Sequence, residues 1–88
     1  MSSHDATLEL DYESASRARL VAASVAREIG EIDDDRSQTT LRRDEERLVL
    51  EIDAADAVAL RAALNTWFSL VDVAERTADA GERVLETR

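Results

Sequence analysis

The sequence predicts a single α+β domain with the element order β-α-β-β-α, in which a three-stranded sheet carries two helices on one face. Three short segments alternate between apolar and polar residues, and two longer segments repeat apolar residues at helical spacing. The helical crossover between the first two strands favours a parallel arrangement of these strands with the third between them. We therefore expect a mixed sheet with antiparallel neighbours, in the order 1-3-2, similar in build to a KH domain.

The chain is short enough to form one domain over residues 1–88. We expect residues 1–5 to be a flexible start and residues 82–88 to be a frayed tail. Small domains bury a modest core and are often reinforced by disulfides, metals or oligomerisation. The sequence has no cysteine and a single histidine, His4, so oligomerisation is the expected reinforcement.

The first strand is predicted over residues 6–12, where small or apolar side chains alternate with Thr, Glu and Asp. Ser14 can cap a helix that runs to about Ile29, and Gly30 is expected to end this helix in the left-handed conformation. Leu20 falls outside the apolar stripe of this helix. That stripe consists of Ala18, Val21, Ala22, Val25 and Ile29.

The second and third strands are predicted as a hairpin over residues 36–43 and 47–53, joined by a polar turn at 44–46. The third strand is the most apolar of the three, as a central strand should be. On its outward side only Val49 interrupts the polar pattern. We expect this other face of the sheet to be solvated, since it carries Glu9, Asp11, Arg42 and Glu51.

The second helix is predicted from Ala54 to about Ala80, with Asp53 as its N-cap. At about 100° per residue its apolar arc is roughly 220° wide, against a little over ~100° for an ordinary surface helix. Alanines widen this arc without requiring burial, so a well-covered core helix is the alternative. Larger residues such as Leu70 and Val73 nevertheless extend it, and we interpret the surplus as a surface for another protein.

The charge balance points to a salt-adapted protein. Twenty acidic residues face eleven basic ones, all of them arginine, for a net charge of −9. This excess fits a salt-rich cytoplasm, where screening shortens the range of self-repulsion, and we expect a halophilic archaeon. A disordered acidic chain is the alternative, but 44% hydrophobic residues with clear periodicity argue against it.

No targeting segment is recognised in the sequence. The N-terminus lacks a basic run followed by an apolar stretch, which disfavours a signal peptide. No unbroken apolar run approaches the ~20 residues that cross a bilayer. We therefore expect a soluble, cytoplasmic protein that does not bind a membrane.

The inventory of reactive groups argues against an enzyme. There is no cysteine nucleophile, no glycine-rich phosphate loop and no second histidine, so we expect no catalytic residues, no cofactor and no metal. The acidic run 33–35 lacks the spacing of a calcium loop and is interpreted as a solvated loop.

Four of the eleven arginines lie on or beside the predicted hairpin and are candidate contacts for RNA phosphates. The favoured alternative is cross-strand pairing with Glu9, Glu45, Glu46 and Glu51, because the hairpin is not strongly basic. The four candidates are Arg36, Arg42, Arg43 and Arg47.

The segment 60–68, Leu-Arg-Ala-Ala-Leu-Asn-Thr-Trp-Phe, resembles the start of the last helix in the small Pcc-family subunit of the KEOPS complex. The motif residues are Leu60, Arg61, Asn65 and Trp67. The preceding strand and aspartate, over residues 48–56, also fit this resemblance. Element order and length agree, so the resemblance covers most of the chain.

The resemblance implies a non-catalytic role in KEOPS, which makes threonylcarbamoyl-adenosine beside the anticodon of tRNA. It implies a homodimer whose helices dock the Kae-family catalytic subunit, with a contribution to tRNA binding. A stand-alone KH-like RNA-binding domain is the alternative, disfavoured by the missing GxxG loop and the acidity. The residues expected on the docking face are Leu20, Ala23, Trp67, Leu70 and Val73.

Overall fold

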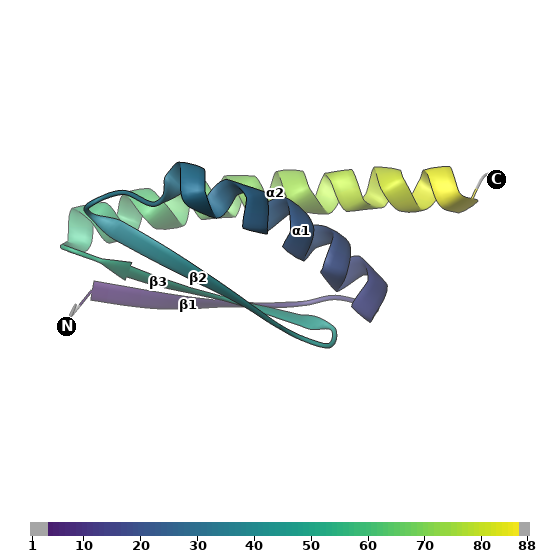
Figure 1. The fold of residues 1–88 in the computed structure, drawn as a ribbon, viewed down its shortest axis with the longest axis horizontal. Coiled ribbons are helices and arrows are strands. Elements are labelled where there is room, and N and C mark those ends of the chain that lie inside the picture. The colour runs from purple at the N-terminus through teal and green to yellow at the C-terminus, as the bar shows by residue number, and fades with distance from the viewer. Residues whose placement is uncertain (1–3, 87–88) are drawn as a thin grey trace.

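The computed structural model describes residues 4–86, and the side chains of residues 4–80. The five predicted elements are all present in the predicted order (Figure 1). Their bounds are β1 His4–Asp11, α1 Ala15–Ile32, β2 Ser37–Asp44, β3 Arg47–Ala54 and α2 Ala57–Glu86.

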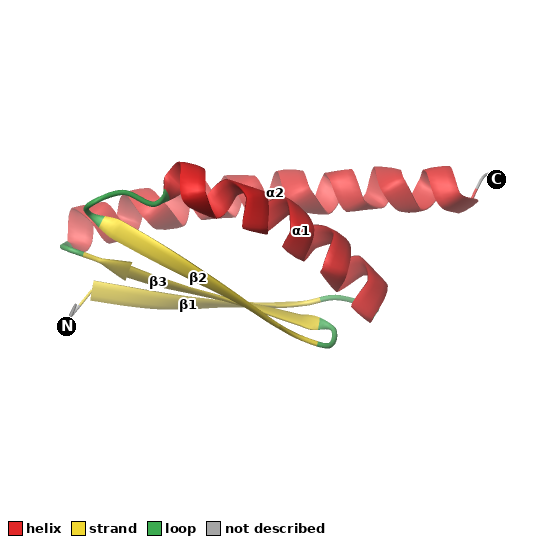
Figure 2. Ribbon diagram, in the orientation of Figure 1, coloured by secondary structure: helices red, strands yellow, loops and turns green. Residues whose placement is uncertain are grey.

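The sheet has the predicted order β1-β3-β2, with β3 antiparallel to both neighbours. Leu50, at the centre of β3, is opposite Leu8 of β1 and Leu41 of β2. This register points the large apolar residues of the three strands, except Val49, to the face that both helices cover (Figure 2). The predicted fold class is therefore confirmed.

Helix α1 begins as predicted and ends later. Ser14 has extended backbone angles, and its hydroxyl oxygen accepts a hydrogen bond from the Arg17 amide at 3.1 Å. The helix continues through Gly30 to Ile32, and no described glycine has a positive φ. The prediction that Gly30 stops the helix in a left-handed conformation is therefore wrong. Instead the chain turns to extended structure at Asp33, whose amide still donates to the Ile29 carbonyl at 3.0 Å.

Helix α2 is capped by a different aspartate from the one predicted. Asp53 is still within β3, opposite Asp5 and Gln38, because strand pairing continues to Ala54. The cap is Asp56, whose carboxylate accepts from the Ala59 amide at 2.8 Å. This hydrogen bond lowers the pKa of the Asp56 carboxyl, as expected of a carboxylate at the positive end of a helix.

The first strand begins earlier, and the last helix ends later, than the sequence predicted. β1 begins at His4, so the last two residues of the expected flexible start are paired in the sheet. Residues 1–3 of that start lie outside the described residues. α2 includes 30 residues and continues past the sheet, giving a molecule 48 Å long (Figure 1). In the expected frayed tail, residues 82–86 are helical in backbone and 87–88 lie outside the described part.

The core lies between the sheet and the two helices. Trp67 is its largest fully buried side chain, and its indole N–H donates to the Thr39 hydroxyl of β2 at 3.0 Å. A buried indole needs such a partner, because an unpaired N–H in an apolar interior is costly. The other fully buried large side chains are Leu48, Leu50, Ile52, Val21 and Val25.

The hairpin turn contains the one positive φ of a non-glycine residue among those described. Glu45, first of the two residues between β2 and β3, has φ 57°. Two-residue hairpin loops require this left-handed geometry to match the twist of the strands. The sequence therefore accepts some backbone strain here, where glycine or asparagine would be more usual.

By length and composition alone, α2 between Ala57 and Ala80 qualifies as a membrane span. The mean hydropathy of this helix reaches the threshold although no unbroken apolar run does, because its most apolar stretch contains at most two charged residues. One such helix is weak evidence for a membrane, since core helices of soluble proteins pass the same test. Of its most apolar stretch 22% is buried inside the chain, and the exposed large apolar residues of α2 include Val58, Phe68 and Val73.

We expect removal of salt to unfold the domain. The net charge of −9 is spread over a small surface, and arginines neutralise only part of it, for example Arg47 with Glu9 and Asp11. Screening at high ionic strength relieves the remaining repulsion. Circular dichroism in molar and in millimolar potassium chloride tests this. An unchanged helical signal at millimolar salt would refute the halophilic interpretation.

Candidate interaction surfaces

A groove runs between α1 and α2 on the side of the helices away from the sheet. We call it the helix groove. Exposed apolar residues lie along it: Val73 of α2 is 51% exposed, and Leu20, one turn before Ser24 on α1, is 40% exposed. Its lining residues are Ser24, Val25, Arg27, Glu28, Leu70, Val73, Ala74 and Thr77.

The predicted docking residues divide into two groups. Leu20, Ala23 and Val73 are exposed, in agreement with a surface role. Leu70 lies at the margin, because it lines the helix groove and also packs against the core. Trp67 is 0% exposed, so its assignment to the docking face is wrong. It sits at the centre of the apolar stripe, which faces the sheet, whereas the groove borders one edge of that stripe.

The charged side chains Arg17, Asp79 and Glu75 near the helix groove are held by an ion pair and a hydrogen bond within the chain. Arg17 of α1 forms an ion pair with Asp79 of α2, so this pair links the two helices beyond the groove. Nearby, the Tyr12 hydroxyl donates to Glu75 at 2.7 Å. Burial, and then this hydrogen bond, raises the pKa of Tyr12 well above its usual range, so the phenol stays protonated as the donor. The Arg17–Asp79 pair joins the two helices, and the Tyr12–Glu75 hydrogen bond joins the segment between β1 and α1 to α2. Neither contact uses the apolar residues of the groove.

The four candidate RNA-binding arginines are exposed, but each makes contacts within the chain. On the open face of the sheet, Arg47 pairs with Glu9 and Asp11, and Arg42 lies 3.7 Å from Glu51. This agrees with the favoured cross-strand interpretation. Of the remaining two, Arg36 pairs with the cap Asp56, and Arg43 donates to the Glu45 carbonyl.

The acidic loop after α1 has a structural role that the sequence did not reveal. Asp34 accepts from the amides of Arg36 and Ser37 at 2.7 and 3.0 Å, and so shapes the turn into β2. Asp33 accepts from the Thr39 amide at 3.0 Å, outside the edge of the sheet. Among the described residues, no group of three or more His, Asp or Glu side chains is arranged to hold a metal ion.

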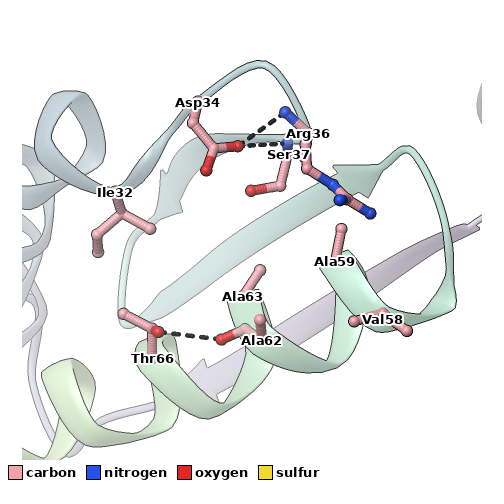
Figure 3. A pocket seen from close by; sticks show the side chains of 9 residues that line it. All are labelled: Ile32, Asp34, Arg36, Ser37, Val58, Ala59, Ala62, Ala63 and Thr66. Carbon is pink, nitrogen blue, oxygen red and sulfur yellow. Dashed lines mark hydrogen bonds between the residues drawn. The ribbon is translucent and has the colours of Figure 1, made fainter.

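A second hollow lies between this loop and the start of α2 (Figure 3). Its floor is made of small side chains such as Ala59, Ala62 and Ala63, with Val58 at 76% exposure on its rim. The polar groups drawn there already serve the fold: Asp34 holds the turn, and the Thr66 hydroxyl donates to the Ala62 carbonyl at 3.0 Å (Figure 3). The hollow offers no obvious chemistry for a specific ligand.

A model of the family described as "Transcription factor Pcc1" matches residues 5–79. The chain belongs to the Pcc1 family. Among solved structures, a chain of the "Crystal structure of binary complex Gon7-Pcc1" is similar over 97% of this chain and 99% of that chain. Its TM-score is 0.59 at 16% sequence identity, which establishes a common fold. A comparison with curated proteins finds no match.

The segment that resembles the Pcc1 family serves both the core and the surface. Leu60 is half-buried and packs against the core with Trp67, whereas Arg61 and Asn65 are exposed on the outward side of α2. Half of the motif is therefore explained by packing of α2 on the sheet. The other half remains available to a partner.

Two exposed apolar residues of this Pcc1-family chain were missing from the predicted face. Phe68 is 58% exposed and Val58 is 76% exposed. Phe68 lies on the opposite side of α2 from Val73, at about 100° from Trp67 on the helical wheel. The wide apolar arc already contained this signal, because an arc of roughly 220° must project beyond the sheet on both sides.

Proposed function

We propose that this chain is a non-catalytic, dimerising scaffold subunit of a cytoplasmic KEOPS complex, and that its helix groove docks the Kae-family catalytic subunit. Membership of the Pcc1 family supports a place in this complex. In this proposal the chain contributes no catalytic group to the synthesis of threonylcarbamoyl-adenosine. It positions the subunit that does so.

The observation that carries the docking proposal is the apolar surface left on the two helices. Val73 and Leu20 are half-exposed beside a groove formed by both helices. Helices with apolar faces that the sheet does not cover need another surface. A helix or helix pair of a partner fits such a groove, with Leu20, Leu70 and Val73 as anchors.

Co-purification tests this function. The tagged chain, recovered from its native cells at high salt, should bring the Kae-family subunit with it, identified by mass spectrometry. A purified catalytic subunit should then bind the purified chain directly. Recovery of the chain without a Kae-family protein, and no binding between the two purified proteins, would contradict the docking proposal.

We expect the open face of the sheet to contribute modestly to tRNA binding by the assembled complex. Replacing Arg42 and Arg47 together by glutamine should lower tRNA affinity several-fold and make its salt dependence shallower, because counterion release scales with phosphate contacts. The matched control replaces Arg19 and Arg76, exposed arginines of α1 and α2, by glutamine. If both variants bind tRNA with equal affinity at matched salt, Arg42 and Arg47 do not contact tRNA, and their role is to pair with the carboxylates of the sheet.

A further inference from the structure

Two charged residues of the helix groove have no partner within the described part of the chain. Arg27 and Glu28 are consecutive residues in the last third of α1, and both line the groove. Neither side chain makes a hydrogen bond or an ion pair with any residue whose side chain the structure describes. Consecutive residues of a helix project about 100° apart, so these two charges do not face each other. The groove therefore presents one positive and one negative group to whatever enters it.

Most other arginines with described side chains already have a partner. Arg17 pairs with Asp79, and Arg76 pairs with Asp72 one turn before it on α2. The fold thus uses its basic groups to neutralise carboxylates, which outnumber them by twenty to eleven. In such an acidic chain, an arginine that lines an apolar groove without a carboxylate of its own is available to an acidic group from outside.

The two ends of the helix groove differ in this respect. Helices α1 and α2 run in opposite directions, and Arg17 near the start of α1 pairs with Asp79 near the end of α2 (Figure 1). This end of the groove therefore has a charge pair that is already satisfied. The other end has the two free charges of Arg27 and Glu28, and Val73 lies between the two ends. An occupant of the groove meets unpaired charge at one end only.

A helix docked in the groove would remove water from both free charges. The guanidinium of Arg27 cannot lose its proton, so it needs an acceptor once the water is gone. A charge that is left unpaired in an interface opposes binding strongly. At molar salt the Debye length is about 3 Å, so a distant opposite charge gives no compensation. Only a group in direct contact with Arg27, and another in contact with Glu28, can replace the water.

We propose that the helix of the catalytic subunit that docks in the helix groove carries a carboxylate that pairs with Arg27 and a basic side chain that pairs with Glu28. This rests on the proposed function and adds the chemistry of the partner surface. Both charges lie beside the apolar stripe of that helix, and together they fix its direction in the groove. In the reverse direction they would meet Arg17 and Asp79, which already pair with each other, and the free charges of the groove would stay unpaired.

Charge reversal at each position tests this contact. Binding of the purified catalytic subunit is measured by titration calorimetry in molar potassium chloride. Arg27→Glu and Glu28→Arg should each weaken binding by about tenfold or more, because each change places like charges in contact. The two changes shift the net charge of the chain in opposite directions, so a common loss of affinity cannot come from net charge. Arg19→Glu is the control, at an exposed arginine of α1 outside the groove, and it should bind like the parent chain.

Rescue by the partner separates a charge contact from a change in the shape of the groove. Thermal melts first confirm that all variants are folded. Reversal of one acidic residue in the docking helix of the catalytic subunit should restore its binding to Arg27→Glu. Reversal of one basic residue of the same helix should restore its binding to Glu28→Arg. Each rescue is a coupling between two specific residues, which a structural effect of either change alone would not produce.

The outcomes distinguish this inference from the proposed function. If the catalytic subunit does not bind the parent chain, the docking proposal itself is refuted. If it binds the parent chain and also binds Arg27→Glu or Glu28→Arg with unchanged affinity, while Val73→Asp no longer binds, the two-charge contact is refuted and the docking site stands. A loss of affinity that no charge reversal in the partner restores would likewise overturn the contact.

Discussion

Replacing Val73 with aspartate will leave the domain folded and abolish its binding to the Kae-family catalytic subunit. Val73 is 51% exposed, so a carboxylate there remains in water and costs the isolated chain little. In the docked complex the same carboxylate would lie against an apolar partner surface. A buried, unpaired charge is strongly unfavourable, and a central interface anchor alone contributes over ~1 kcal/mol.

Leu50→Asp is the contrasting variant. Leu50 is 0% exposed and lies in the central strand between Leu8 and Leu41. Truncation of a buried leucine to alanine costs ~2–5 kcal/mol, and aspartate adds a buried charge to that loss. A domain of this kind has a total stability of about 5–15 kcal/mol, so we expect Leu50→Asp to be unfolded.

A thermal melt and a pull-down with the catalytic subunit, both at high salt, measure the two effects. Val58→Asp is the matched control, because Val58 is an exposed valine of the same helix that lies outside the helix groove. It should melt and bind like the parent chain. If Val73→Asp binds the catalytic subunit as Val58→Asp does, the helix groove is not the docking site.

Leu70, another residue expected on the docking face, is less suitable than Val73 for this experiment. It lines the helix groove and also packs against the core. Leu70→Asp should therefore lose both binding and part of its stability. The helical wheel shows the same ambiguity, since Leu70 lies about 60° from Trp67, at the boundary between covered and uncovered surface.

The fold was predictable because its signals are local and mutually consistent. Alternation in β3 and its apolar character predicted a central strand, and the crossover formed by α1 then determined the order of the sheet. Element ends were less predictable. Asp53 and Asp56 are both good caps, and only the extent of pairing between β3 and its neighbours decides between them. That pairing is a tertiary property.

The surface was harder to predict than the fold. A helical wheel shows how wide the apolar arc of α2 is, but it does not show which residues of that arc the sheet covers. Trp67 was assigned to a partner, and it proved to be fully buried because the sheet lies beneath the centre of the arc. Leu20 is exposed, as its position outside the apolar stripe of α1 predicts. Exposure can be predicted from sequence for residues outside an apolar stripe. For residues inside a wide stripe, it depends on which part of the stripe the sheet covers, and only the structure shows that.

The second large effect is expected at Trp67. Trp67→Ala should destabilise the domain by about 3–5 kcal/mol, because it removes the largest fully buried side chain and leaves a cavity between α2 and the sheet. The indole also donates its N–H to Thr39 at 3.0 Å, which ties α2 to β2. Trp67→Ala should therefore be folded only at high salt, and marginally.

Thr39→Val separates the hydrogen bond from the packing. Valine keeps nearly the shape of threonine but removes the acceptor, so the buried indole N–H of Trp67 loses its partner at a cost of about 1–3 kcal/mol. Trp67→Phe with Thr39→Val removes both polar groups, and this pair should lose less than the sum of the two single variants. Urea unfolding followed by circular dichroism measures all of them, since Trp67 is the sole tryptophan. Strict additivity of the two changes would show that the Trp67–Thr39 bond contributes nothing to the fold, and the loss in Trp67→Ala would then be one of packing alone.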